Sequence, residues 1–144
     1  MEQTLYIGYW WPIALVVGWC FFMILMNGAS YLLSPSWRKL HRSYATTNEP
    51  AGKAFWFQQM EVGPLWGNVF KFTINDQSLF ISTCPPFSCW SPVFEVPWRE
   101  VQVKRDVYLF FHWGYEVEFG NSGAKAKFSK RAVKNWVPYV QLPQ

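Results

Sequence analysis

A run of 24 residues without a formal charge, residues 10–33, constrains this chain more than any other feature. As a helix with a rise of 1.5 Å per residue it would be about 36 Å long, enough to cross a hydrocarbon core of about 30 Å. Inside lipid, an isolated segment satisfies its backbone hydrogen bonds only as a helix. The run therefore predicts one transmembrane α-helix at 10–33, preceded by an extramembrane segment at 1–9.

The basic residues are unevenly placed, because all thirteen Lys and Arg lie at or after Arg38. Positive charge that flanks a transmembrane helix is retained on the cytoplasmic side. We therefore predict a bacterial inner (cytoplasmic or intracytoplasmic) membrane protein with a periplasmic N-terminus and a cytoplasmic C-terminal domain. A cleaved signal peptide is the rival interpretation. It lacks a basic n-region, and Asn27-Gly28-Ala29 is a poor cleavage site.

Aromatic and basic side chains flank the uncharged run, a pattern typical of membrane interfaces. The predicted interface anchors are Trp10, Trp11, Tyr31, Trp37, Arg38, Lys39 and Arg42.

Four small residues share one side of the predicted helix. Ala14, Gly18, Gly28 and Ala29 fall within about 100° of its circumference. Small residues allow a second helix to approach closely, so the stripe predicts a helix-packing interface. The alternative is that Gly and Ala are simply common in transmembrane helices.

Residues 34–51 change character and predict an interfacial segment followed by a linker. SPSWRKLHRSY favours a short helix with Trp37, Leu40 and Tyr44 on one side and basic residues on the other. TTNEPAG then has the composition of a linker.

Residues 52–144 predict a small antiparallel β domain. Alternating apolar and polar residues indicate about six or seven strands, with Gly114 as the tight turn between strands at 107–113 and 115–119. Ser129 is a candidate N-cap for a C-terminal helix, which Pro138 would kink or end. Its predicted apolar face comprises Ala132, Val133, Trp136, Val137 and Val140.

This order of antiparallel strands closed by a C-terminal helix resembles that of pleckstrin-homology-like (PH-like) domains. More locally, SWRKLHRSY at 36–44 and NDQSLFIS…PPF…PVFEVPWREV at 75–101 resemble an uncharacterised family of small bacterial membrane-anchored proteins that carry a PH-like β domain. The resemblance covers about half of the chain. It implies a fold, and it brings no catalytic residues with it.

Two cysteines separated by four residues, Cys84 and Cys89, supply only half of the four ligands that a zinc site needs. We predict free thiols. A disulfide is the alternative, and it would imply the opposite membrane orientation. His41 could ligate a porphyrin-type cofactor or simply be solvated, and His112 fits a structural role in a strand.

No nucleophilic triad or phosphate-binding loop appears in the sequence. Glu116 and Glu118 are expected to face solvent on one side of a strand, which makes them a poor acid–base pair. We therefore predict no catalytic residue, no metal ligand and no cofactor bound through the protein's own ligands. Contact with pigments or lipids within a complex is left open.

A basic run near the C-terminus has no acidic residue after Glu118. It comprises Lys125, Lys127, Lys130, Arg131 and Lys134. Such a run could contact anionic lipid or a partner, each base contributing about 1 kcal/mol near a charged surface. A solvated helix face is the alternative, and the absence of a known motif argues against nucleic acid.

The sequence thus predicts a non-catalytic accessory subunit of a larger bacterial membrane complex. An energy-converting complex, photosynthetic (reaction-centre–antenna) or respiratory, fits by analogy. The helix would pack laterally and the β domain would cap the cytoplasmic face. The alternative is a membrane-tethered PH-like module that binds anionic lipid or a peptide.

Overall fold

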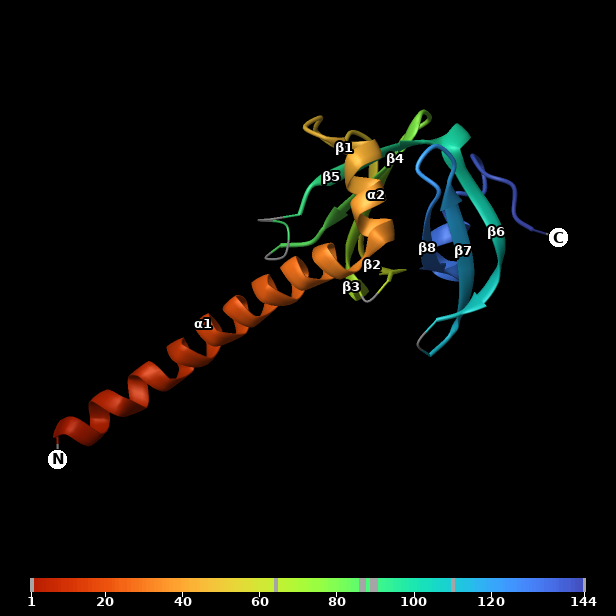
Figure 1. Ribbon diagram of the computed structural model, residues 1–144. Coiled ribbons are helices and arrows are strands. Elements are labelled where there is room, and N and C mark those ends of the chain that lie inside the picture. The colour runs from red at the N-terminus through yellow and green to blue at the C-terminus, as the bar shows by residue number, and fades with distance from the viewer. Residues whose placement is uncertain (1, 64, 86–87, 89–90, 110, 144) are drawn as a thin grey trace.

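The computed structural model describes residues 2–63, 65–85, 88, 91–109 and 111–143. Two helices, α1 (Glu2–Leu33) and α2 (Pro35–Tyr44), precede a β-sheet, and a short helix, α3 (Lys130–Lys134), follows it. Figure 1 shows α1 projecting away from the β domain, whereas α2 turns sharply from it and runs along the domain.

Eight strands among the described residues form one curled antiparallel sheet, in the order β1-β5-β4-β3-β2-β8-β7-β6. A 3-10 turn, η2 (Trp98–Glu100), joins the fifth strand to the sixth. The strands are β1 (Ala45–Thr46), β2 (Lys53–Val62), β3 (Leu65–Ile74), β4 (Ser78–Thr83), β5 (Val93–Pro97), β6 (Val101–Tyr108), β7 (Trp113–Phe119) and β8 (Ala124–Ser129).

The predicted fold class needs correction. Side chains in α1 are described without a break at 10–26, and no helix among the described residues is both long and apolar enough to cross a membrane. The prediction of a transmembrane helix at 10–33, with the single-pass membrane architecture built on it, is therefore wrong. The predicted six or seven strands are also too few, because the short β1 at one sheet edge gave no sequence signal.

Strand β2 is where the sheet bends. It pairs with β3 over most of its length but with β8 only at Met60 and Glu61, and its register shifts on both sides of Gln58. Phe57 has a positive φ of 53°, a conformation that β-bulges usually give to glycine. The Gln58 side chain donates a hydrogen bond of 2.8 Å to the Trp56 carbonyl oxygen and holds this bulge.

The core lies inside the curl of the sheet, where α2 and the C-terminal segment close it. Three α2 side chains, Trp37, Leu40 and Tyr44, belong to one buried cluster with residues of the sheet and of α3. Trp136 lies at the centre with its ring 4.8 Å from that of Phe128. Because α2 is part of this core, the predicted domain boundary at residue 51 divides a single packed unit.

Ser34 and Pro35 define the start of α2. The Ser34 hydroxyl accepts a hydrogen bond of 3.2 Å from the Trp37 amide, and Pro35 occupies the first turn, where its missing N–H costs nothing. Ser34 has extended backbone angles, so the chain leaves α1 and re-enters a helix in a new direction. The predicted short helix is confirmed, but its apolar side faces the protein core.

The chain passes from β6 to β7 between Tyr108 and Trp113, whereas the sequence placed the turn at Gly114. Gly114 is inside β7, where an added Cβ would lie well under 3.0 Å from Leu109 Cδ1 and from the Phe128 carbonyl oxygen. The glycine therefore serves close packing between strands and not a reversal of the chain.

The C-terminal helix is shorter than predicted. Ser129 caps it as expected, accepting a hydrogen bond of 3.2 Å from the Ala132 amide. α3 ends at Lys134, and the apolar residues beyond it continue in turns. Trp136 is fully buried, whereas Val137 is 49% exposed.

Candidate interaction surfaces

The side chains of α1 form the largest exposed apolar surface among the described residues. Large apolar residues of α1 with 44–70% of their surface exposed are Trp10, Trp11, Ile13, Leu15, Val16, Val17, Trp19, Phe21, Phe22, Ile24, Leu25, Met26, Leu32 and Leu33. Three of them, Leu15, Val16 and Val17, are consecutive and therefore point about 100° apart around the helix. The helix is apolar on all sides.

The small-residue stripe lies on this helix as predicted from the spacing. Ala14, Gly18 and Gly28 are exposed, and Ala29 is half-buried. A Cβ added at Gly18 or Gly28 would meet nothing within 4 Å. The stripe is thus open to a neighbour, and its use as an interface stays a prediction.

The predicted interface anchors have different environments. Trp10 and Trp11 are exposed on α1, and Arg38, Lys39 and Arg42 are exposed on the outer side of α2. The side chain of Tyr31 lies outside the described residues.

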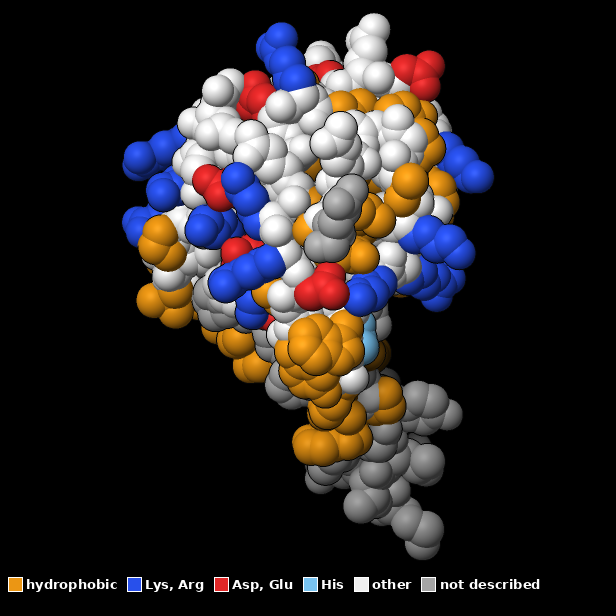
Figure 2. Space-filling model, turned by 90° about the vertical axis from the view of Figure 1, so that its right-hand side faces the viewer, with side chains coloured by type: hydrophobic (Ala, Val, Ile, Leu, Met, Phe, Trp, Pro, Cys, Tyr) orange, Lys and Arg blue, Asp and Glu red, His pale blue; other side chains and the backbone are white. Residues whose placement is uncertain are grey.

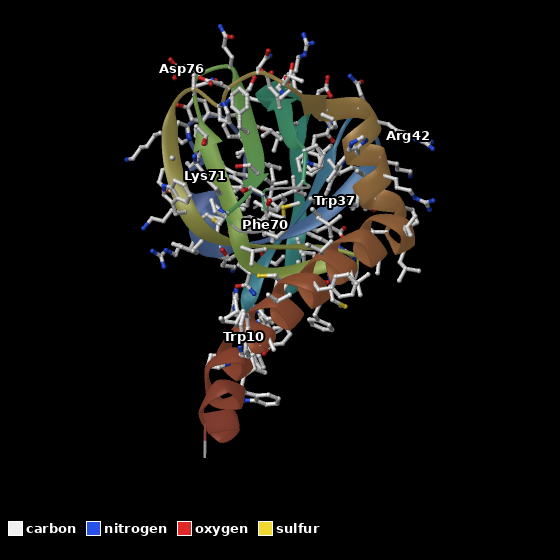
Figure 3. The ribbon with its side chains drawn as sticks, turned by 90° about the vertical axis from the view of Figure 1, so that its left-hand side faces the viewer. Trp10, Trp37, Arg42, Phe70, Lys71 and Asp76 are labelled. Carbon is white, nitrogen blue, oxygen red and sulfur yellow. The ribbon has the colours of Figure 1, made fainter. Side chains whose placement is uncertain are left out.

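Trp37 is a core residue and not an interface anchor. It is 5% exposed, and its ring lies 4.9 Å from that of Phe94 and 6.4 Å from that of Phe70. Figure 3 shows Trp37 turned toward Phe70 inside the sheet and Arg42 turned away from it.

The predicted basic run is partly neutralised by acids on neighbouring strands. Lys127 Nζ lies 2.6 Å from Glu61 Oε1 and Lys130 Nζ lies 3.4 Å from Asp106 Oδ2. Strand pairing aligns Arg105 with Glu116, Glu116 with Lys127, and Lys127 with Glu61, so charges of alternating sign cross four strands.

The remaining members of the run are Lys125, Arg131 and Lys134, all exposed. None has an acidic partner in the part of the chain that the structure describes. Glu116 and Glu118 alternate with the buried Val117 and Phe119, and they pair with Arg105 and Lys104 at 3.1 and 3.7 Å.

A second exposed apolar feature, missed by the sequence reasoning, lies where β6 turns into β7. Tyr108, Phe111 and Trp113 are 58%, 78% and 58% exposed, and we call these three residues the aromatic tip. The rings of Tyr108 and Trp113, which are paired across the two strands, meet edge to face at 5.6 Å. Misplacing the turn at Gly114 hid this cluster, because it put all three residues within one strand.

A third exposed feature lies on the outer side of the β2 bulge. Trp56 is 48% and Phe57 is 70% exposed, and Lys71 Nζ lies 4.3 Å from the centre of the Trp56 ring. Here a cation lies over one of the two exposed rings.

The thiols and imidazoles form no reactive site in the described residues. Cys84 is a buried free thiol, as predicted, and Cys89 lies outside the described residues. No group of three or more His, Cys, Asp or Glu side chains able to hold a metal occurs among the residues described. His112 lies in the turn after β6, not in a strand, and its carbonyl oxygen accepts a hydrogen bond of 2.8 Å from the Leu109 amide.

One part-buried polar contact ties α2 to η2, the turn between β5 and β6. The Tyr44 hydroxyl donates a hydrogen bond of 2.5 Å to Glu100 Oε2, and Asn121 Nδ2 donates to Glu100 Oε1 at 2.6 Å. Burial raises the pKa of the Tyr44 phenol, and the hydrogen bond to the Glu100 carboxylate raises it further. The contact stabilises the attachment of α2.

No protein-family model, curated protein or solved structure matches this chain. The resemblance to PH-like membrane-anchored proteins therefore stays a prediction, as does the cellular location.

Proposed function

We propose that this protein is a non-catalytic accessory subunit of a larger protein complex, held there by α1. The observation that carries the proposal is the exposed apolar surface that surrounds α1, including Trp19 at 63% and Phe21 at 62% exposure. Exposed apolar patches larger than a few hundred Å² mark interaction sites in stable proteins. Covering one such side chain completely is worth about 1.5–3 kcal/mol, so covering many of them favours assembly strongly.

The distribution of these side chains indicates more than one neighbour. A helix that is apolar on one side only needs a single partner surface, whereas a helix apolar all round is buried on every side. Because Leu15, Val16 and Val17 point in three directions and all are more than half exposed, one partner helix would leave apolar surface uncovered. We therefore infer that α1 packs laterally among several apolar helices, while the β domain remains outside that bundle.

The test is assembly of the full chain with its neighbours in the cells that produce it. A tagged full chain is extracted gently, separated by size and analysed by mass spectrometry. We expect it to migrate with other subunits at constant stoichiometry. Migration as an isolated small protein under the same conditions would contradict the proposal.

A variant pair tests whether the small-residue stripe is the closest contact. Gly18→Leu adds four side-chain carbons on the stripe, where a neighbouring helix would approach, and should reduce the yield of complex at least about 10-fold. Val16→Phe adds the same number of carbons about 160° away around the helix and is the matched control. Equal yields from the two variants would show that the stripe is not the contact.

The alternative function, binding an anionic lipid or peptide, is favoured by Lys125, Arg131 and Lys134. These three exposed bases would contribute about 1 kcal/mol each beside an anionic surface. We rank it second because Lys127 and Lys130 are already paired with Glu61 and Asp106. Binding of the chain to anionic vesicles that is lost when all three bases are changed to Ala would favour this alternative.

A further inference from the structure

The joint between α1 and α2 is a single residue, Ser34, which the β domain encloses. Ser34 is 0% exposed, whereas the last two residues of α1, Leu32 and Leu33, are 68% and 70% exposed. In Figure 1 the end of α1 meets the domain where β2 and β3 are joined, and Figure 2 shows the hydrophobic side chains of α1 on an arm that extends away from the domain. Because the two leucines pack on little, the direction of α1 depends on contacts at Ser34.

Pro35 prevents α1 from continuing into α2 as one straight helix. A proline disfavours helical backbone angles in the residue before it. Ser34 accordingly has extended angles, with φ −100° and ψ 105°. The local sequence therefore requires a bend at this residue. It does not determine the direction of the bend, because the extended region spans about 100° in φ and about 80° in ψ.

The hydroxyl of Ser34 connects the two elements that surround it. Its oxygen accepts a hydrogen bond of 3.2 Å from the Trp37 amide of α2 and donates one of 3.5 Å to the carbonyl oxygen of Val62, the last residue of β2. The Ser34 carbonyl oxygen also accepts a hydrogen bond of 3.2 Å from the Arg38 amide. Since α2 and β2 both contribute to the core, Ser34 is held by the domain on both sides.

Gly63, the residue after β2, packs directly on this joint. Its φ is +57°, and an added Cβ would lie 2.7 Å from Ser34 Oγ and 3.1 Å from Ser34 Cβ. An approach under 3.0 Å forces one of the two groups to move. The Ser34 hydroxyl cannot rotate away without losing its hydrogen bonds to Trp37 and Val62. Glycine therefore allows the end of β2 to lie against Ser34.

We propose that Ser34 and Gly63 form a lock that holds α1 at one fixed angle to the β domain, so that the helix and the domain move as one rigid body. A single unsupported residue between two helices would be a hinge, because hinges absorb changes in φ and ψ. Here the burial of Ser34, its hydrogen bonds and its contact with Gly63 remove that freedom. The β domain then has one orientation relative to whatever binds α1, a consequence that rests on the proposed function.

The length of α1 makes the lock measurable. Cys20 lies about 21 Å from Ser34 along the helix, at a rise of 1.5 Å per residue. A change of about 20° in the direction of α1 therefore moves Cys20 by about 7 Å. Cys20 is an exposed free thiol, so it can carry a spin label without a substitution in α1.

The test measures distances within the full chain, kept in a mild detergent that covers α1. One spin label is attached to Cys20. The other is attached to a cysteine that replaces Ala54, which is exposed near the far end of β2, or in a second preparation Arg131, which is exposed on α3. All preparations carry Cys89→Ser, and Cys84 is buried. Double electron–electron resonance gives the distribution of each distance, and we expect one narrow distribution for each pair of labels.

Two glycine variants separate the contact with Ser34 from backbone strain. Gly63→Ala and Gly123→Ala place alanine at nearly the same positive φ, +57° and +60°, but a Cβ at Gly123 would meet nothing within 4 Å. Gly63→Ala should shift or broaden at least one distance distribution by about 5 Å or more, because a small change in angle is multiplied along the helix. Gly123→Ala is the matched control and should leave both distributions unchanged.

Three results would overturn the lock: broad distributions in the parent protein, no change in Gly63→Ala, or an equal change in Gly123→Ala. Near-ultraviolet circular dichroism confirms that each variant is folded. If Gly63→Ala is not folded, Ser34→Ala takes its place, since it removes both hydrogen bonds of the hydroxyl and should broaden the distributions in the same way. Unchanged distances in Ser34→Ala would then count against the lock.

The distance measurement and the assembly experiment fail separately. The distances are measured without a partner, so a flexible joint would contradict the lock and leave the proposed function of α1 intact. Migration of the full chain as an isolated protein would contradict the proposed function, whereas narrow distances in the same chain would still support the lock.

Discussion

Helices α1 and α2 are neighbours in the chain, separated by Ser34 alone, yet they have opposite environments. α1 has the more apolar sequence and exposes it, with Leu33 at 70% at its very end. α2 is mostly polar, yet it buries Trp37, Leu40 and Tyr44 against the sheet. The difference shows that periodicity, and not total hydropathy, determines which helix packs on its own domain.

The physical reason is the shape of each apolar surface. In α2 the apolar residues recur at three- and four-residue spacing, so one side of the helix fits into the curled sheet and the basic side remains in water. In α1 apolar residues occupy every side, so no single contact with the small β domain could bury them. α2 therefore completes the fold, and the apolar side chains of α1 remain exposed.

The largest expected effect is the difference in stability between a variant that lacks a tryptophan of α2 and one that lacks a tryptophan of α1. Trp37→Ala removes a ring that packs on Phe94 and Phe70 and should lower the free energy of unfolding by about 3–5 kcal/mol. Trp19→Ala removes an exposed ring and should change it by less than about 0.5 kcal/mol in the isolated chain. Urea denaturation followed by far-ultraviolet circular dichroism measures both. Similar losses for the two variants would mean that α1 is packed on the domain.

A smaller effect should come from the polar attachment of α2. Tyr44→Phe removes the hydrogen bond to the Glu100 carboxylate and should cost about 1.5–3 kcal/mol near neutral pH.

The same variant should change the dependence of stability on alkaline pH. Because the pKa of Tyr44 is raised in the folded state, its contribution is complete below the unfolded value of 10.0 and is lost as pH rises through the folded value. Denaturation at a series of pH values should thus give a shallower alkaline loss for Tyr44→Phe. An identical alkaline slope for both proteins would show that Tyr44 does not carry this linkage.

The smallest effect concerns the residue that separates the two helices. Ser34→Ala removes the cap on the Trp37 amide and should destabilise the domain by about 1 kcal/mol, whereas Ser34→Asn keeps an acceptor and should cost less. Thermal unfolding measures the two variants. If Ser34→Ala leaves the unfolding temperature unchanged, capping is not the role of the hydroxyl.

Most strands and the start of α3 could be predicted from the sequence, because the patterns that indicate them lie within single elements. Alternation located β2, β4, β5 and β8 to within a few residues, and the Ser129 cap marked the start of α3. β1 was not readable, because two residues that pair with Phe94 and Val93 carry no pattern of their own. The turn after β6 was misplaced since Gly114 has the residue type of a turn but is required by packing.

The candidate surfaces divide in the same way. The small-residue stripe on α1 depends only on helical spacing, so residue numbers were enough to find it. The ion pair between Lys127 and Glu61 joins residues far apart in the chain. The sequence alone therefore did not show that part of the basic run is neutralised. The aromatic tip required the true position of a turn, which long-range contacts of Leu109 and Phe128 determine.

By itself the sequence determined that one helix is apolar on every side, that the next has a single apolar side, and that a β domain follows. These properties depend on the order of residues within one element. Only the tertiary structure decided that the apolar side of α2 is buried while α1 remains uncovered, and that the rings of Tyr108 and Trp113 meet beside the exposed Phe111. Whether a side chain is buried depends on the surface of another element that packs against it, and this cannot be deduced from the residues of its own segment.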